Sequence, residues 1–286
     1  MIEPTMLKAK GDGVEIQVAL WEGKEKTVLC VHGLTGNCRC WDSVAFALSP
    51  EHRVLAMDLR GRGYSEHPPS GYSLNHHCRD MACILDDLGL DRAIIMGHSL
   101  GAHISLHFAA QYPHRIEKLV LVDGAGQLSE AQRSKVYEGI RPSLERLGRV
   151  FPSFEAYVEN MKRFPFLKPW PSAIEAYYRH DTEKVDGGIR SSIQKVHIQE
   201  EIQNLRKMNM AECYPNIGCP VLILRAPEGM LSRDDILLPE DVIDRMLREI
   251  PNAKLVNVDG TNHYSIIFHP NDVRDRAIQE FISADR

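Results

Sequence analysis

Residues 93–102 have the sequence AIIMGHSLGA, and the interpretation of the whole chain begins from them. Four apolar residues lead into a G-x-S-x-G motif and a helical pattern begins directly after it, so the motif joins a buried strand to a helix. A serine at the tip of such a turn has a strained backbone, and Gly97 and Gly101 lie too close to neighbouring backbone to carry side chains. The pattern predicts that Ser99 is a nucleophile at a helix N-terminus; the alternative is a purely structural tight turn.

Length and composition indicate one large α/β domain with an insertion, or two small domains. The chain has 286 residues, of which 43% are apolar, enough for a sizeable core. Its net charge is −5 and it has no long basic run, which argues against nucleic acid or an anionic membrane as the main partner. No stretch has the ~18 consecutive apolar residues of a membrane span. Residues 1–10 lack an apolar signal core, so we expect a cytoplasmic protein.

The cysteine pattern gives little support for a metal site or a disulfide framework. The chain has seven cysteines, an odd number, and no C-x-x-C pair. Cys38 and Cys40 lie near His32 in the sequence, a combination that could bind a metal. We favour free thiols in a reducing compartment, and we predict no metal and no cofactor.

Short apolar runs alternate with amphipathic helical patterns along most of the chain. We predict strands at residues 14–21, 27–31, 53–59, 93–96, 118–122, 220–224 and 254–258. Helical patterns separate most of these runs, for example at 74–88, 239–249 and 272–282. Such alternation is typical of α/β proteins, so the predicted fold is a doubly wound, mostly parallel sheet with helices on both faces.

The alternation stops between residues 127 and 215, where the sequence is helical in character and rich in aromatic residues. We predict that this segment is a helical lid inserted into a core domain made of residues 1–126 and 216–286. Most of its aromatic side chains should form the core of the lid itself, and some should line a cavity for substrate. The segment therefore suggests a small-molecule substrate with a hydrophobic acyl or aromatic part.

Three polar groups follow predicted strands: His32 with Gly33, Ser99, and His263. In a doubly wound sheet, ligands bind at the carboxyl ends of the strands. We therefore expect these groups to converge, although they are far apart in the sequence.

At these positions the chain resembles the α/β-hydrolase family, over nearly its whole length. The matching motifs are H-G at 32–33, D-L-R-G-x-G-x-S at 58–65, G-H-S-L-G at 97–101 and N-H at 262–263. The similarity is strongest to lid-bearing esterases, C–C-bond hydrolases and cofactor-free haloperoxidases. This resemblance implies that Ser99 attacks an acyl carbon and that His263 takes up the serine proton and returns it to the leaving group. It also implies an oxyanion hole made by the backbone N–H groups of Leu34 and Leu100.

The acid that orients the histidine departs from the family pattern. After the predicted strand 220–224 many family members have G-x-x-D, but here residues 226–229 are Ala-Pro-Glu-Gly. Asp123 ends the strand that follows the nucleophile helix, where some branches of the family place the acid, and we predict that it completes the triad. Glu228 is the alternative acid, and a third possibility is that neither carboxylate has this role. An aspartate before a glycine can also simply form a turn.

Two other histidines and one arginine in these motifs are interpreted as structural. We expect His32 to orient the oxyanion loop and His98 to pack beside the elbow. Arg60 is expected to stabilise its own loop, and the alternative is that it borders the pocket mouth.

The leading functional hypothesis is hydrolysis of a carboxylic ester or related acyl compound through an acyl-enzyme. An alternative is a C–C hydrolase of a vinylogous diketone, which would use the same residues and would need cationic lid side chains to hold a carboxylate. The candidates for that role are Arg141, Arg163 and Arg179. A second alternative is a non-catalytic ligand-binding relative, against which the presence of both Ser99 and His263 argues.

Overall fold

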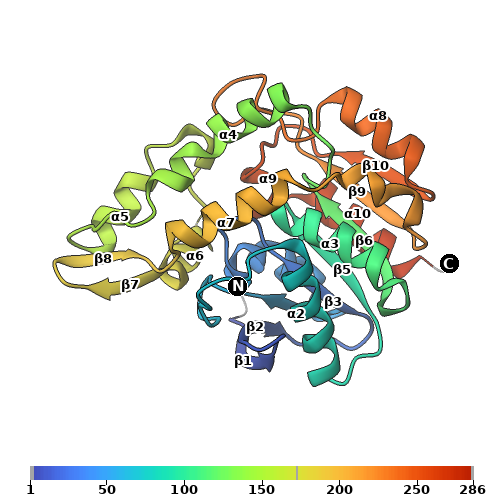
Figure 1. Cartoon of the computed structure of the whole chain (residues 1–286), viewed down its shortest axis with the longest axis horizontal. Helices are drawn as coiled ribbons and strands as arrows, with labels where there is room; N and C mark the ends of the chain where they lie inside the picture. The colour runs from blue at the N-terminus through green and yellow to red at the C-terminus, as the bar shows by residue number, and fades with distance from the viewer. Residues whose placement is uncertain (1–2, 172, 285–286) are drawn as a thin grey trace.

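An eight-stranded, mostly parallel sheet forms the centre of the computed structural model, which describes residues 3–171 and 173–284 (Figure 1). The strand order is β1-β2-β4-β3-β5-β6-β9-β10. Only the β1–β2 and β2–β4 pairs in this sheet are antiparallel. The strands are β1 (Thr5–Lys10), β2 (Glu15–Trp21), β3 (Thr27–Val31), β4 (Arg53–Met57), β5 (Ala93–His98), β6 (Ile116–Val122), β9 (Val221–Arg225) and β10 (Ala253–Asn257). The predicted fold class is confirmed.

Helices cover both faces of the sheet, and each face has its own hydrophobic cluster. The helices of this part of the chain are α1 (Asp42–Leu48), α2 (Leu74–Asp87), α3 (Leu100–Gln111), α8 (Glu240–Glu249), α9 (Ser265–Phe268) and α10 (Asp272–Ser283). Helices α2, α3 and α8 pack on one face, and α1, α9 and α10 pack on the other. Strand residues alternate between the clusters, as Leu29 and Cys30 do, because successive side chains of a strand point to opposite faces.

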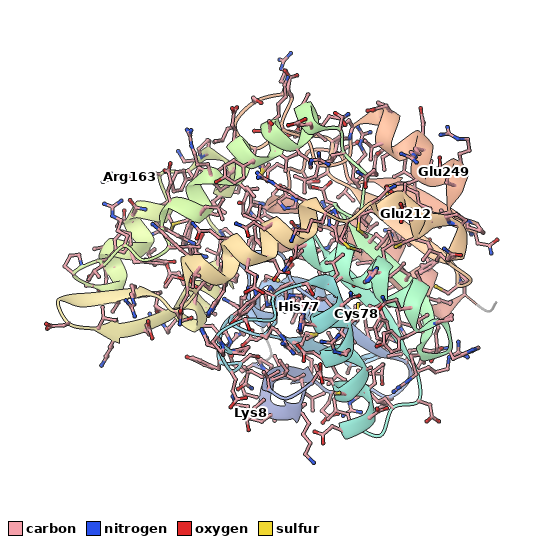
Figure 2. The ribbon with its side chains drawn as sticks, in the orientation of Figure 1. Lys8, His77, Cys78, Arg163, Glu212 and Glu249 are labelled. Atoms are coloured by element: carbon pink, nitrogen blue, oxygen red, sulfur yellow. The ribbon has the colours of Figure 1, made fainter. Side chains whose placement is uncertain are left out.

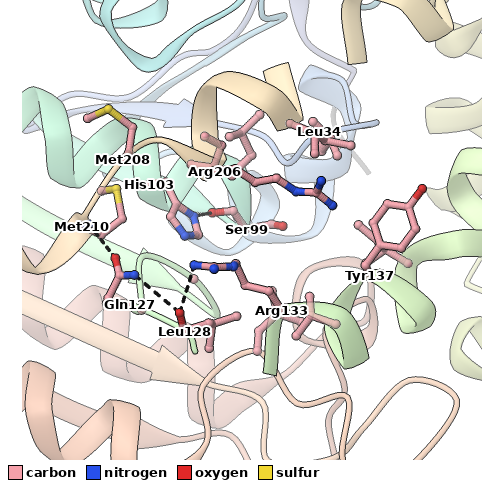
Figure 3. Close-up of a pocket in the computed structure, with 18 of the residues that line it drawn as sticks. Leu34, Ser99, His103, Gln127, Leu128, Arg133, Tyr137, Arg206, Met208 and Met210 are labelled. Carbon is pink, nitrogen blue, oxygen red and sulfur yellow. Dashed lines mark hydrogen bonds between the residues drawn. The ribbon is translucent and has the colours of Figure 1, made fainter. Parts of the chain in front are cut away.

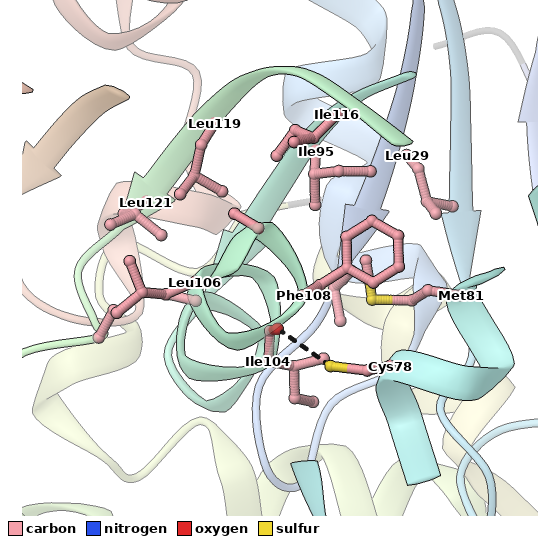
Figure 4. Packing of buried hydrophobic residues seen from close by; sticks show 14 of the residues in the cluster. Leu29, Cys78, Met81, Ile95, Ile104, Leu106, Phe108, Ile116, Leu119 and Leu121 are labelled. Atoms are coloured by element: carbon pink, nitrogen blue, oxygen red, sulfur yellow. Dashed lines mark hydrogen bonds between the residues drawn. The ribbon is translucent and has the colours of Figure 1, made fainter. Parts of the chain in front are cut away.

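Helix α2 illustrates how the sequence pattern produces this packing. Leu74, Cys78, Met81 and Leu85 recur every three or four residues, which places them on one side of the helix, and all four are buried. Figure 4 shows Cys78 and Met81 packed against α3 and the strands, with the Cys78 thiol directed at the Ile104 carbonyl at 3.6 Å. The apolar face of α2 therefore packs against α3 and β1 on this face of the sheet.

The segment between β6 and β9 contains a β-hairpin in addition to the predicted helices. Its elements are α4 (Glu130–Glu145), α5 (Phe154–Met161), α6 (Ala173–Asp181), β7 (Thr182–Val185), β8 (Gly188–Ser191) and α7 (Lys195–Arg206). The hairpin was not predicted. Its signal is the dipeptide Asp186-Gly187, because glycine adopts the left-handed backbone of a hairpin turn without steric cost, and Gly187 has φ = 82°.

Buried polar contacts attach this segment to the core. Glu201 of α7 accepts a hydrogen bond of 2.9 Å from Arg62 and lies 2.8 Å from the ring nitrogen Nε2 of His77 in α2. His180 of α6 lies 2.7 Å from the Asp58 carboxylate, again through Nε2. Figure 2 labels His77 where α2 passes beside α7. These contacts hold α6 and α7 against the loop that follows β4.

We predict that the Glu201 contact makes stability depend on pH. Burial by itself raises the pKa of Glu201, but the charges and hydrogen bonds of His77 and Arg62 outweigh burial and lower the pKa from 4.5 to about 2. Because the pKa of Glu201 is depressed in the folded state, the ionised carboxylate contributes fully to the free energy of unfolding above about pH 4.5. This contribution is lost as the pH falls toward about 2. We expect Glu201→Gln to lower the free energy of unfolding by about 2–3 kcal/mol near pH 7, measured by urea denaturation.

Glu175→Gln, an exposed glutamate in the first turn of α6, serves as the control and should lower the free energy of unfolding by less than about 1 kcal/mol. The difference in the free energy of unfolding between wild type and Glu201→Gln should become steadily smaller below about pH 4.5. A difference that stays constant down to about pH 3 would show that the carboxylate charge does not stabilise this contact.

Among the described residues, none of the helices combines the length and the apolar character needed to cross a bilayer.

Candidate active site

Ser99 lies at a strained turn between β5 and α3. Its backbone angles are φ = 57° and ψ = −120°, a conformation that non-glycine residues rarely adopt. A Cβ on Gly97 would lie 2.2 Å from the Gly101 carbonyl oxygen, and one on Gly101 would lie 2.0 Å from the Val31 oxygen. Both positions therefore exclude a side chain, which confirms the steric reason inferred for the two glycines.

His263 and Asp123 come together at the carboxyl ends of β10 and β6, two strands that pair on either side of β9. The distance between His263 Nδ1 and Asp123 Oδ2 is 2.8 Å, and both side chains are buried. The other carboxylate oxygen of Asp123 accepts the Ala226 N–H at 3.2 Å. A carboxylate at Nδ1 requires the hydrogen on that nitrogen, which leaves the Nε2 lone pair free to accept a proton. Ser99 and His263 line the same small cavity.

The alternative acid, Glu228, lies away from this pair. Its side chain is exposed, and within the described part of the chain it makes no hydrogen bond to His263. Its backbone instead donates to the Thr261 carbonyl at 3.0 Å and pairs with Asn262. Glu228 thus belongs to the strand-like contact that supports the histidine loop, and Asp123 is the carboxylate beside the histidine.

The two structural histidines hold the loops around Ser99. His32 Nδ1 donates to the Gly33 carbonyl at 2.7 Å and Nε2 accepts the Leu59 N–H at 2.9 Å. Burial lowers the pKa of His32 to about 4, so the ring is neutral near pH 7. The His98 ring stacks on His263 at 4.5 Å and its Nε2 lies 2.9 Å from the His263 carbonyl.

The predicted oxyanion loop lies directly against the serine. A Cβ on Gly33 would lie 3.0 Å from the Ser99 Cβ, so a side chain at this position would have to displace Ser99 by a few tenths of an ångström. In the described residues the N–H groups of Leu34 and Leu100 have no hydrogen-bond acceptor. Both residues line the pocket beside Ser99.

A pocket of about 570 Å³ opens above Ser99 between the core and helices α4 and α7 (Figure 3). Its walls are mostly apolar. The apolar lining residues are Leu34, Leu100, Leu128, Val136, Tyr137, Ile140, Ile202, Leu205, Met208, Met210 and Leu237. Apart from Ser99, sequence reasoning missed the polar residues of the lining, which include His103, Arg133 and Arg206. His103, one turn after the serine, donates from Nδ1 to the Ser99 carbonyl at 2.9 Å, and burial lowers its pKa.

The arginines proposed from the sequence to hold a carboxylate lie elsewhere. None of Arg141, Arg163 and Arg179 lines the pocket above Ser99 or the small cavity beside His263. Arg141 pairs with Glu145 at 3.4 Å, and Figure 2 shows Arg163 at the outer edge of the molecule. Arg60 binds Asp80 through two hydrogen bonds of 2.7 and 2.8 Å, as its structural interpretation expects. The spacing of residues in the sequence alone could not show which arginines of the segment 127–215 line the pocket above Ser99.

The aromatic residues of the segment 127–215 divide between core and cavity. Tyr157, Phe166 and Tyr178 are buried in the hydrophobic cluster of the segment and the adjoining sheet face. Tyr137 lines the large pocket and Tyr177 lines the small cavity beside His263. Aromatic residues in the core of the segment and aromatic residues lining a cavity were both expected from the sequence.

Three possible metal ligands meet below the same segment, but they already bind one another. One ligand atom each from Cys38, Asp58 and His180 lies within 4.8 Å of the other two. His180 Nε2 is 2.7 Å from the Asp58 carboxylate and 3.5 Å from the Cys38 sulfur. Burial raises the pKa of the Cys38 thiol, which keeps it protonated and a poor ligand. Cys40, the other thiol of the sequence pattern, is not part of the cluster.

The sequence model of the alpha/beta hydrolase fold matches residues 26–270. The chain belongs to the α/β-hydrolase family. The match extends from β3 to the loop before α10 and includes the elbow, Asp123 and His263.

Relatives of this α/β-hydrolase include proteins named as hydrolases. A 2-(acetamidomethylene)succinate hydrolase of Mesorhizobium japonicum is 28% identical over 263 residues, which cover 92% of this chain and 90% of the relative. A putative carbamate hydrolase of Pseudomonas savastanoi pv. phaseolicola is 26% identical over 256 residues, covering 88% and 92%. The crystal structure of an E-2-(acetamidomethylene)succinate hydrolase aligns with a TM-score of 0.86 and 25% identity, covering 98% of this chain and all of the other.

Proposed function

We propose that this α/β-hydrolase cleaves a carboxylic ester or a related acyl compound through an acyl-enzyme formed on Ser99. The observation that carries the proposal is the contact of 2.8 Å between His263 and Asp123, with Ser99 lining the same cavity at a strained turn. A strained serine, a buried histidine and a buried carboxylate are the three groups that nucleophilic acyl transfer requires.

In this mechanism His263 accepts the hydroxyl proton at Nε2 while the Ser99 oxygen attacks the acyl carbon. Asp123 keeps the hydrogen on Nδ1 and stabilises the imidazolium that forms. The protonated histidine then gives its proton to the leaving group, and the acyl group stays on Ser99. A water molecule, deprotonated by His263, releases the acid in the second half of the reaction.

The negative oxygen of the tetrahedral intermediate is assigned to the N–H groups of Leu34 and Leu100. Both donors lack an acceptor in the described structure, so they need not break another hydrogen bond in the transition state. Leu100 is also the first residue of α3, where the helix dipole favours negative charge.

We assign the segment 127–215 as the lid and residues 1–126 with 216–286 as the core domain. Helices α4 and α7 supply most of the pocket wall opposite the sheet, and this wall is largely apolar. The segment therefore selects the acyl part of the substrate, and the core domain supplies the three catalytic groups. The names of the two relatives above denote acyl–nitrogen compounds, so amides and carbamates are included among the acyl substrates to be tested.

A fluorophosphonate probe tests the proposal directly, because it phosphonylates only a serine that is activated as a nucleophile. We expect one probe per folded protein, located on Ser99 by peptide mass spectrometry, and no labelling of heat-unfolded protein. If folded protein is not labelled, the alternative of a ligand-binding relative without activity is favoured.

A further inference from the structure

Two arginines enter the pocket from the helices that cover it. Arg133 belongs to α4 and Arg206 is the last residue of α7, and both line the same cavity as Ser99. In the view of Figure 3 their side chains extend into the pocket from opposite walls, with Ser99 between them. A ligand bound above the serine would therefore contact positive charge from two elements.

Neither guanidinium has a carboxylate partner among the described residues. Arg133 donates one hydrogen bond of 3.2 Å, to the Leu128 carbonyl, and Arg206 donates none within the described chain. The buried arginines of the described chain are paired with carboxylates, as Arg62 is with Glu201 at 2.9 Å and Arg60 with Asp80 at 2.7 Å. The two pocket arginines are exposed, and they keep nearly all of their donors for water or a ligand.

Two acidic residues also line the pocket, Glu130 and Glu138. Both are exposed, and neither comes within 4.0 Å of a guanidinium of Arg133 or Arg206. The rest of the wall is mostly apolar, so the arginines are its only cationic groups among the described residues.

The helix dipole favours a cation at the position of Arg206 but not at the position of Arg133. A cation is favoured at the C-terminus of a helix, where Arg206 lies, and disfavoured near an N-terminus. Arg133 lies near the N-terminus of α4, which Ser129 and Gln132 already cap through two hydrogen bonds. The position of Arg133 is therefore unfavourable for the isolated helix, whereas an anion in the pocket would make it favourable.

We infer that the acyl substrate carries a carboxylate, which Arg206 and Arg133 bind while the acyl carbon lies at Ser99. This inference rests on the proposed function and specifies its substrate as a monoester or monoamide of a dicarboxylic acid. The apolar wall accommodates the carbon chain between the two ends. A guanidinium matches a carboxylate geometrically and can bind it through two parallel hydrogen bonds.

Two esters that differ only in the distant charge test the inference. They are mono-4-nitrophenyl adipate, which keeps a free carboxylate, and its methyl ester, which does not; nitrophenol release gives kcat/KM for each. In the wild type we expect the anionic ester to be preferred about 100-fold, about tenfold from each arginine. Arg206→Gln and Arg133→Gln should each lower the ratio of the two kcat/KM values by about tenfold, mainly through KM. Arg141→Gln, on the outer side of α4, is the matched control and should leave the ratio at the wild-type value.

This experiment distinguishes a failure of the proposed function from a failure of the inference that the substrate carries a carboxylate. If the wild type cleaves neither ester, nor the amides and carbamates above, the proposed function is wrong. If it cleaves both esters without preferring the anion, or if both pocket variants keep the wild-type ratio, the inference is wrong and the proposed function stands.

A binding measurement decides the inference without turnover. Titration calorimetry with adipate should show binding to the wild type and to Arg141→Gln. The dissociation constant should be about tenfold higher for Arg206→Gln. Equal affinities in all three proteins, or no adipate binding to the wild type, would overturn the assignment.

Discussion

Ser99→Ala is expected to lower kcat for a good ester by roughly 10⁴- to 10⁶-fold, to near the uncatalysed background. Alanine removes the attacking oxygen, and no other hydroxyl at the turn can take its place. The strained backbone at this position, with φ = 57°, is set by the strand, the helix and the two glycines, so the fold should remain intact. Steady-state release of nitrophenol from a short-chain ester provides the measurement.

Ser105→Ala is the matched control for this experiment. Ser105 lies in α3, the helix that begins directly after Ser99; it is buried, and its hydroxyl has no hydrogen-bond partner in the described structure. Its removal should leave kcat unchanged. Both variants should have near-wild-type thermal midpoints and circular dichroism spectra. If purified Ser99→Ala retains more than a few per cent of wild-type activity, Ser99 is not the nucleophile.

Asp123→Asn is expected to lower kcat by up to about 10⁴-fold. The amide has nearly the same shape as the carboxylate but can present its NH₂ group to His263 Nδ1. That contact favours the tautomer with the hydrogen on Nε2, which cannot accept the serine proton. The amide also removes the negative charge that stabilises the imidazolium, so the loss should appear in kcat more than in KM.

Glu228→Gln provides the comparison, because it makes the same chemical change in the other candidate carboxylate. Glu228 is exposed and its observed contacts are made by its backbone, so activity should stay close to wild type. A large loss in Glu228→Gln with a small loss in Asp123→Asn would reverse the assignment. Small losses in both would mean that neither carboxylate orients the histidine.

The sequence was most informative where a local pattern has one physical explanation. A continuous apolar run followed by G-x-S-x-G predicted a strand, a strained turn and a helix, and the steric reason for Gly97 and Gly101 is confirmed by the structure. The alternation of strands and helices likewise predicted the mostly parallel sheet, because each element buries its own apolar face. The hairpin β7–β8 was missed although Asp186-Gly187 marks it, since the surrounding helical pattern was given more weight.

The sequence by itself thus determined the fold class, the strained serine and the loop that carries the late histidine, because each depends on neighbours in the chain. It left the partner of His263 open between two carboxylates, and only the tertiary structure placed Asp123, 140 residues away, at 2.8 Å. The tertiary structure also decided which arginines enter the pocket. Arg133 and Arg141 are both in α4, yet only Arg133 lines the cavity. Which side of a helix faces the site depends on how whole elements pack, and residue spacing within the helix does not contain that information.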